Sequence, residues 1–212
     1  DSIGPDIHIY LNNPNFRNGD QTYEFPHFYA DIYDENGINT AGTGIGHDLL
    51  MVVDEDPKQT YVLNDYFQAN NNSYQSGQVS YKMIEQTEGA HTLTFRAWDL
   101  YNNSNTAALS FHVVKGMDPN IYSVLTYPNP VARTGVLNVK IEYNQPNEII
   151  STLINLYDLS GRLIYQMQGS GTENIQWNLG EVNMESGIYV YQVNIKTPTS
   201  NYVSKAGKLI IN

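Results

Sequence analysis

The chain has 212 residues, of which 41% are hydrophobic and 12% aromatic, and tyrosine occurs 17 times. Its 22 acidic side chains outnumber 11 basic ones and give a formal charge of -11, which repels nucleic-acid phosphates and anionic membrane surfaces. Cysteine is absent, so these residues offer no disulfide, no thiolate metal ligand and no cysteine nucleophile. We therefore expect no nucleic-acid partner and a fold stabilised by packing and backbone hydrogen bonds.

No apolar run reaches the ~18 residues that a membrane-spanning helix needs, so we expect no transmembrane segment. The first residues lack the basic and apolar stretches of a signal peptide. If the parent protein is exported, we expect this chain to be a mature piece or a fragment of it. The length and a change of pattern near residue 116 predict two domains, residues 1–116 and 117–212.

Residues 1–116 alternate apolar and polar side chains in at least six short runs separated by turn residues. Such alternation predicts antiparallel strands that bury one face, so we expect an all-β, immunoglobulin-like sandwich. Residues 63–69 are the exception, because they favour one helical or 3₁₀ turn. The apolar positions of the runs are Ile7, Ile9 and Leu11; Phe28, Ala30 and Ile32; Leu49, Met51 and Val53; Val79, Tyr81 and Met83; Leu93, Phe95 and Ala97; Leu109, Phe111 and Val113.

Two acidic clusters lie in this region, at residues 31–36 and 54–56. Oxygen-rich loops can bind calcium, but neither cluster has the EF-hand spacing, and Asp34-Glu35-Asn36-Gly37 is a good hairpin turn by itself. We therefore predict no cofactor, with a structural calcium ion as the alternative. Farther along, Asp99 is placed to cap a turn before the last strand, and Trp98 to cover the edge of a sheet.

The histidines lack a spacing that would bring two imidazoles to one metal ion. His8 and His112 fall on the polar faces of their strands and His91 at a strand start, so we expect solvated or capping side chains. The five histidines are His8, His27, His47, His91 and His112.

The segment Gly44-Ile45-Gly46-His47-Asp48 brings a histidine and an aspartate together on a glycine-rich loop. Adjacent residues of an extended chain point to opposite faces, which argues against a catalytic His–Asp pair. No Lys-Ser/Thr follows the glycines and no helix begins there, so a phosphate loop is also disfavoured. We interpret the segment as a closely packed loop and predict no catalytic, cofactor-binding or metal-binding residue in the chain.

Residues 115–120, Lys-Gly-Met-Asp-Pro-Asn, break the strand pattern and predict a linker. Beyond it, Tyr127-Pro128-Asn129-Pro130 has two prolines that fix φ and remove amide donors, which predicts a rigid lead-in to the first strand of the second domain. Residues 136–143 then alternate as a half-buried strand. Further strands are expected at residues 150–156, around Ile175 and Trp177, at 188–195 and at 202–211.

Asp158-Leu159-Ser160-Gly161-Arg162 predicts a hairpin connection, because Asp can bond its own backbone and Gly accepts positive φ. It leads into a strand that carries Leu163, Tyr165 and Met167. About seven strands in this region again predict an immunoglobulin-like sandwich.

The second region resembles the type IX secretion sorting domain of Bacteroidetes and, through it, the hook-capping immunoglobulin-like module. The resemblance is carried, in order, by Tyr127-Pro128-Asn129-Pro130, Tyr157-Asp158-Leu159-Ser160-Gly161-Arg162, the Trp177 strand and Ser186-Gly187-Ile188-Tyr189-Val190-Tyr191. In the first region, residues 34–39, 44–49, 61–67 and 89–93 resemble the part that follows the catalytic domain in the PorU-like sortases, which are gingipain-family cysteine peptidases.

The resemblance implies a non-catalytic C-terminal region of a cell-surface sortase, in which the Cys and His of catalysis belong to an upstream peptidase domain. It implies that upstream domain and a PorV-like outer-membrane β-barrel as partners, on the extracellular side. One alternative is the sorting domain and immunoglobulin-like module of a secreted cargo such as an adhesin or hydrolase. Another, suggested by the 17 tyrosines, is a carbohydrate-binding sandwich, which needs coplanar exposed aromatic rings on one face.

Overall fold

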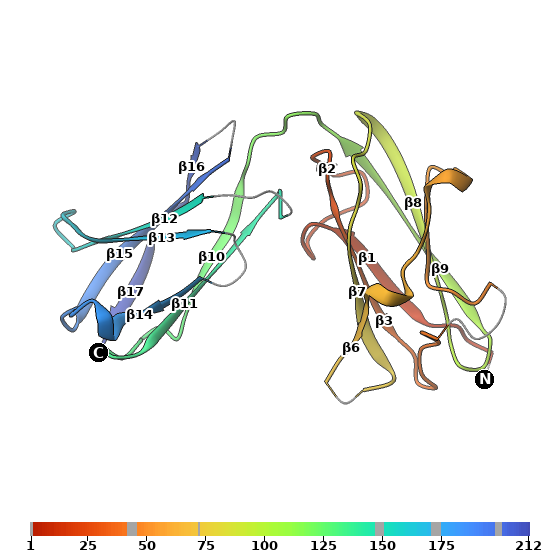
Figure 1. Ribbon diagram of the computed structural model, residues 1–212, viewed down its shortest axis with the longest axis horizontal. Coiled ribbons are helices and arrows are strands. Elements are labelled where there is room, and N and C mark those ends of the chain that lie inside the picture. Colours follow the sequence, from red (N-terminus) through yellow and green to blue (C-terminus); the bar gives the residue numbers. More distant parts are fainter. Residues whose placement is uncertain (1, 42–45, 72, 147–150, 171–174, 198–200) are drawn as a thin grey trace. The chain divides into compact units, whose positions relative to one another are not determined.

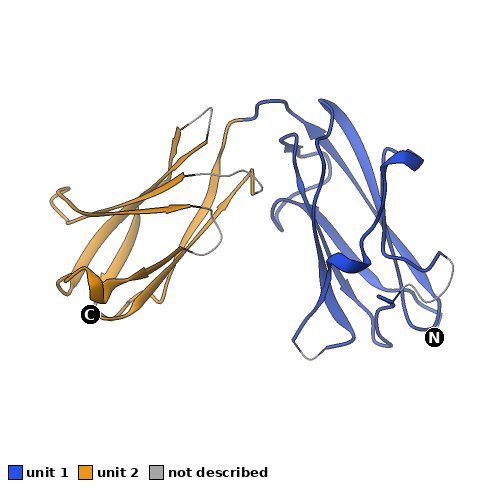
Figure 2. Cartoon of the chain, viewed as in Figure 1, with its two compact units in different colours: residues 1–117 blue, residues 118–212 orange. Residues whose placement is uncertain are grey.

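The computed structural model describes all residues except 1, 42–45, 72, 147–150, 171–174 and 198–200 (Figure 1). Strands dominate the described residues, whose helical segments are three single 3₁₀ turns: η1 (Pro57–Gln59), η2 (Asn64–Tyr66) and η3 (Leu179–Glu181). None of them is long and apolar enough to cross a membrane. The chain divides into two compact units, residues 1–117 and 118–212 (Figure 2), and both are immunoglobulin-like β-sandwiches.

The first unit packs a four-stranded sheet against a five-stranded one. The four-stranded sheet has the order β1 (Asp6–Leu11), β3 (His27–Tyr33), β7 (Ser76–Lys82), β6 (Phe67–Ala69). The five-stranded sheet has the order β2 (Gln21–Thr22), β9 (Ser104–Val113), β8 (Gly89–Trp98), β4 (Leu50–Val53), β5 (Thr60–Val62). All pairs are antiparallel except β2 with β9.

The core of this unit lies between the sheets and confirms the alternation of the sequence. Each of the six predicted runs contributes buried side chains, among them Leu11, Phe28, Met51, Phe95 and Phe111. The 3₁₀ turn expected within residues 63–69 is η2.

The turn at Asp34 forms as expected, but it does not make a hairpin. Asp34 Oδ1 accepts the Asn36 amide at 2.8 Å, and Gly37 has a φ of 101°, which favours glycine. The next residue, Ile38, bridges to Asp99, and the chain then crosses to β4 in the other sheet. Since the neighbours of β3 are β1 and β7, the hairpin prediction is wrong while the turn is right.

The second unit packs a three-stranded sheet, β10 (Ile121–Tyr127), β11 (Val136–Tyr143), β14 (Ile175–Asn178), against a five-stranded one. The latter has the order β13 (Leu163–Ser170), β12 (Ser151–Tyr157), β15 (Gly187–Lys196), and both β16 (Asn201–Val203) and β17 (Gly207–Ile211) pair with β15. The apolar face predicted for residues 136–143 is buried. Ile150 lies outside the described residues.

Two strand predictions need correction in this unit. Strand β10 ends at Tyr127, the first residue of Tyr127-Pro128-Asn129-Pro130, so that motif ends the first strand instead of leading into it. The single strand expected at residues 202–211 is two strands, because Ser204 interrupts the pairing with β15. Its hydroxyl oxygen accepts the Val193 amide at 2.9 Å while its own amide donates to the Val193 carbonyl at 2.7 Å, so a side chain replaces a backbone partner.

Candidate functional site at the C-terminal strand

Strand β17 is held on both of its edges. On one edge it pairs with β15, in the register from Gly187 opposite Ile211 to Tyr191 opposite Gly207. On the other edge lie residues 129–133, which continue directly from β10. Two of the three motifs of the second region, Tyr127-Pro128-Asn129-Pro130 and Gly187-Ile188-Tyr189-Val190-Tyr191, therefore meet at β17.

The Asn129 side chain pairs with β17 as a peptide group would. Its Nδ2 donates to the Lys208 carbonyl at 2.7 Å, and its Oδ1 accepts the Ile210 amide at 3.0 Å. Proline has no amide hydrogen, so Pro128 and Pro130 could not donate to this edge, and the asparagine between them supplies the donor instead. The peptide bonds before both prolines are cis.

Backbone pairing continues where the side chain stops. The Val131 amide donates to the Ile210 carbonyl at 2.9 Å, the Asn212 amide to the Val131 carbonyl at 2.9 Å, and the Arg133 amide to the Asn212 carbonyl at 3.0 Å. Val131 is buried in the core of the unit. These bonds make residues 129–133 a short parallel neighbour of β17, so Lys208–Ile211 has a paired neighbour on each edge.

Gly207 begins β17 where no side chain fits. A Cβ at this position would overlap the ring of Tyr191, which is buried below it. The Tyr191 hydroxyl donates to the Val124 carbonyl of β10 at 3.2 Å, so the ring links the two sheets of the sandwich. The close approach explains why glycine stands here.

The third motif forms the predicted hairpin between β12 and β13. Asp158 Oδ1 accepts the amides of Ser160 and Arg162 at 2.9 and 3.0 Å, and Gly161 has a φ of 85°. The Ser160 hydroxyl, followed by the backbone and side chain of Arg162, lowers the pKa of the Asp158 carboxyl by hydrogen bonding.

We expect Asp158→Asn to weaken the acid sensitivity of the second unit. Because the folded pKa is lowered, the ionised carboxylate stabilises the fold above its unfolded pKa of about 4 and loses this effect as pH falls through the folded pKa. Asparagine keeps an acceptor oxygen but does not titrate. Denaturation followed by Trp177 fluorescence between about pH 5 and pH 3 should show a shallower loss of stability than in the native chain. An identical slope would contradict the expectation.

We expect Asn129→Ala to destabilise the second unit by about 2 kcal/mol, because two hydrogen bonds to β17 are lost. Asn129→Asp keeps the acceptor for the Ile210 amide and loses the donor to Lys208. Hydrogen exchange of the Ile210 amide should therefore accelerate strongly in the alanine variant and less in the aspartate variant. Asn201→Ala, at an exposed position of β16, is the control and should leave this amide protected.

Comparison with known proteins agrees with this arrangement. Residues 125–212 match the profile of the secretion system C-terminal sorting domain. The whole chain aligns with dimeric latent PorU from Porphyromonas gingivalis at 30% identity and a TM-score of 0.59, covering 20% of that chain. The chain resembles the C-terminal region of PorU. It spans about a fifth of PorU's length, and the likeness to that C-terminal part fits a non-catalytic region.

Other structures align more weakly. The Ig1-2 module of the Drosophila receptor protein tyrosine phosphatase DLAR has 9% identity and a TM-score of 0.35, with 98% of each chain covered. Murine CEACAM1b has 14% identity and a TM-score of 0.32, with 98% of this chain and all of that chain covered. A search of curated proteins returned no match.

The match to the sorting domain contains all three motifs of the second region. It runs from Leu125, in β10, through the Asn129 contacts and the Asp158 turn to β15 and β17. A sorting domain of the type IX system implies a secreted or cell-surface protein. In this PorU-like chain, sequence reasoning missed the contacts of Asn129 with β17 and the close approach of Tyr191 to Gly207. Both involve residues that are distant in the sequence.

His91 differs from its prediction as a solvated or capping residue. It is buried on the inner face of β8, in phase with Leu93 and stacked on Phe111 at a centroid distance of 5.3 Å. Its Nδ1 lies 2.6 Å from Asp54 Oδ2 and its Nε2 2.6 Å from the Thr87 carbonyl oxygen. The prediction relied on the place of His91 at the start of a strand. It is wrong because His91 is two residues from Leu93 and therefore faces the core with it.

The aspartates of the two acidic clusters contact neighbouring protein groups. Asp54 accepts the Thr92 amide in addition to contacting His91, and Asp56 caps η1 through the Lys58 amide. Asp31 accepts from the Gln78 side chain at 2.7 Å. In the part of the chain that the structure describes, no group of three His, Asp or Glu side chains is arranged to hold a metal ion.

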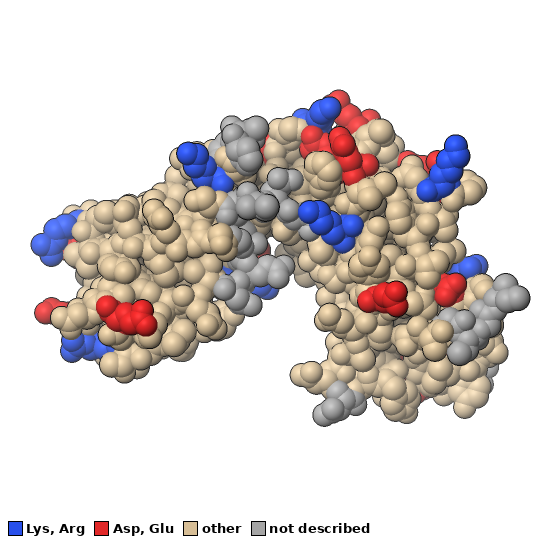
Figure 3. Space-filling view, in the orientation of Figure 1, with Lys and Arg blue, Asp and Glu red and all other residues tan. Residues whose placement is uncertain are grey.

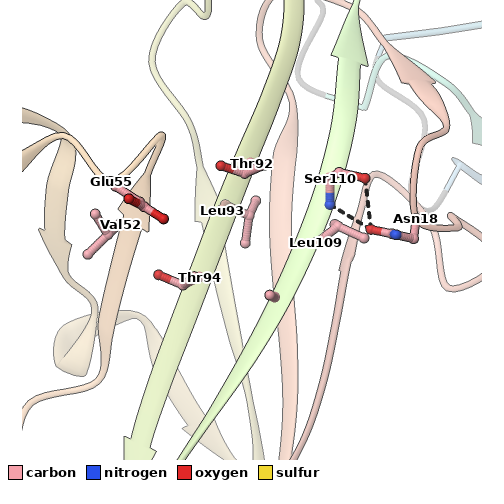
Figure 4. A pocket seen from close by; sticks show the side chains of 9 residues that line it. Asn18, Val52, Glu55, Thr92, Leu93, Thr94, Leu109 and Ser110 are labelled. Carbon is pink, nitrogen blue, oxygen red and sulfur yellow. Dashed lines mark hydrogen bonds between the residues drawn. The ribbon is translucent and has the colours of Figure 1, made fainter.

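A depression of about 340 Å³ lies on the outer face of β8 and β9 in the first unit (Figure 4). Its floor carries small side chains, including Thr92, Thr94 and Ser110. Asn18 stands at one side, where its Oδ1 accepts the Ser110 amide and hydroxyl at 2.7 and 2.9 Å, and Glu55 stands at the other. The lining holds one ionisable group, Glu55, so we assign it no acid–base chemistry.

Three aromatic rings on β1 and β3 stack on one another. Tyr10 and Tyr29 stack at a centroid distance of 5.2 Å with a 20° interplanar angle, and His27 stacks on Tyr29 at 4.6 Å. Tyr10 is buried, and burial followed by the charge of Asp31 raises its pKa. This row of rings does not form the coplanar exposed platform that carbohydrate binding requires.

Proposed function

We propose that the chain is the non-catalytic C-terminal region of a sortase-type cysteine peptidase of the gingipain family, acting in type IX secretion at the cell surface of Bacteroidetes. It positions an upstream peptidase domain and contacts outer-membrane partners, among them a PorV-like β-barrel. The observation that supports this most is the alignment to PorU over both units at 30% identity. A peptidase of this type needs a cysteine, which these residues lack, so catalysis comes from the upstream domain.

Strand β17 limits how a partner protein can bind the second unit. Strand β17 is closed on both edges by β15 and by residues 129–133, so a partner cannot add a strand to it. At β17, recognition therefore uses exposed side chains of the sheet face and the adjoining loops. The second unit is also nearly neutral, with seven acidic and six basic residues in 118–212, which removes long-range repulsion from a membrane-embedded partner.

A secreted cargo that carries the same sorting domain is the second candidate, because the family match at residues 125–212 suits cargo as well as sortase. The two differ in what precedes the described chain. Sequencing the full gene product decides this point: a gingipain-like domain with paired Cys and His upstream supports the sortase, and any other domain supports cargo.

Deletion of residues 118–212 from the parent gene tests the positioning role. The purified truncated protein should still hydrolyse peptides, while the cells should lose surface-bound peptidase and accumulate cargo with uncleaved sorting domains. A pull-down with the PorV-like barrel should succeed with the intact protein and fail with the truncated one. Normal cargo processing and normal barrel binding by the truncated protein would overturn the proposal.

A further inference from the structure

Three side chains with nitrogen donors gather on the outer face of β8. Arg96 and Trp98 are two residues apart on this strand and therefore share a face, opposite to the core residues Phe95 and Ala97. The Arg96 guanidinium carbon lies 5.5 Å from the centre of the Trp98 ring, and the His47 ring packs on Trp98 at a centroid distance of 4.3 Å. Arg96 Nη2 also reaches the Gly46 carbonyl at 3.4 Å.

Each of the three side chains has a buried nitrogen without a hydrogen-bond partner among the residues that the structure describes. These nitrogens are His47 Nδ1, Arg96 Nε and Trp98 Nε1. Buried polar atoms are almost always hydrogen-bonded, so a ligand that bonds these nitrogens would remove an energetic penalty. Arg Nε and Trp Nε1 can only donate, so the group that would satisfy both must be an acceptor.

Arg96 has no carboxylate partner among the described ion pairs, although the first unit is strongly acidic. Residues 1–117 contain 15 acidic and 5 basic side chains, and acidic groups gather visibly at one end of this unit (Figure 3). Among the described ion pairs, none includes Arg96. The nearby Asp99 lies on the other face of the strand and is bonded within its own turn. A partly buried guanidinium in an acidic unit thus keeps its capacity for a carboxylate.

We propose that His47, Arg96 and Trp98 form a binding site for an oxyanion of the carboxylate class. A carboxylate oxygen accepts from a guanidinium N–H and an indole N–H at once, and charge-assisted bonds of this kind are the strongest neutral-pH contacts available to Arg96. Phosphate offers the same oxygens but carries up to two charges, and the net charge of this unit repels a dianion more than a monoanion. The site therefore selects a carboxylate over a phosphate.

The test is a titration of the ¹⁵N-labelled 212-residue chain with sodium acetate, against sodium chloride at the same ionic strength, at pH 7. The Trp98 indole and Arg96 Nε–H resonances should shift with acetate and stay still with chloride. Trp177 is an internal control, because its Nε1 is also buried without a partner but it stacks on Tyr165 and has no guanidinium contact among the described residues. Its indole resonance should not move.

Arg96→Gln should reduce the acetate affinity about tenfold or more, since the charge-assisted bond is lost. Arg17→Gln, at an exposed position, should leave the affinity unchanged. If Arg96→Gln unfolds the first unit, Arg96→Lys serves instead. Lysine keeps the positive charge but lacks the planar guanidinium with its Nε donor, so it should still weaken acetate binding.

Three results would overturn the proposal: equal shifts with acetate and chloride, acetate shifts that survive the Arg96→Gln change, or a Trp177 shift as large as that of Trp98. An arm with inorganic phosphate at equal ionic strength tests the ligand class. A tighter response to phosphate than to acetate would contradict the assignment to carboxylates.

Discussion

Asp99→Ala is expected to lower the unfolding free energy of the first unit by about 3 kcal/mol, because three amide groups lose a charged acceptor that is itself fully buried. Asp99 is fully buried, and its carboxylate accepts the Tyr101 amide at 2.8 Å, the Asn103 amide at 2.7 Å and the Asn103 side-chain amide at 2.7 Å. Alanine supplies no acceptor, and the space that the Asp99 side chain fills is closed to solvent. The loss should appear in urea denaturation followed by Trp98 fluorescence in a Trp177→Phe background.

The second unit contains a matched control for this prediction. Asp158 makes the same bonds to the amides two and four residues ahead, and each turn closes with a bond from the Asp amide to the carbonyl four residues on. Asn102 and Gly161 take positive φ at the equivalent position. Since the Asp158 turn is exposed, water replaces the lost acceptor, and Asp158→Ala should cost much less. Equal losses in the two turns would show that burial does not set the cost of Asp99→Ala.

The sequence predicted most of the core because period-two alternation reports directly which face of a strand is buried. Strand β10 escaped prediction because its alternation is broken. A register shift between Ile121 and Ser123 places a bulge at Tyr122, so the inward-facing Ile121 and Val124 are three residues apart. The missing strand then made Tyr127-Pro128-Asn129-Pro130 look like a lead-in to the first strand.

The contacts of the candidate site could not be predicted from local pattern. Asn129 forms hydrogen bonds with Lys208 and Ile210, which lie 79 and 81 positions farther along the chain. The flanking prolines indicate a stiff segment, but they do not indicate which strand it contacts. The partner of His91 is 37 residues away, at Asp54, which follows β4 and is far from His91 in the sequence. Short turns such as the one at Asp158 were predicted correctly because all their bonds lie within five residues.

Leu209→Ala should destabilise the second unit by about 3 kcal/mol, since it removes a fully buried side chain from a packed core. Leu209 lies in β17 opposite Tyr189 and belongs to the core of the second unit. Trp177 fluorescence should report the loss, while Trp98 should report an unchanged first unit. Lys208→Ala, at the neighbouring exposed position, is the control and should leave the stability of both units within about 0.5 kcal/mol of the native value.

The same pair of variants distinguishes two modes of recognition. Partners bind either the folded surface of the second unit or the linear sequence of the last residues. Leu209→Ala and Lys208→Ala change adjacent residues of one short segment by comparable chemistry, but only the first loosens the sandwich. If partners read the assembled surface, cells that express the Leu209→Ala parent protein should show reduced surface display in proportion to the unfolded fraction, and a lower growth temperature should restore it. If display fails with Lys208→Ala instead, recognition depends on the exposed side chain of the strand and not on the fold that holds it.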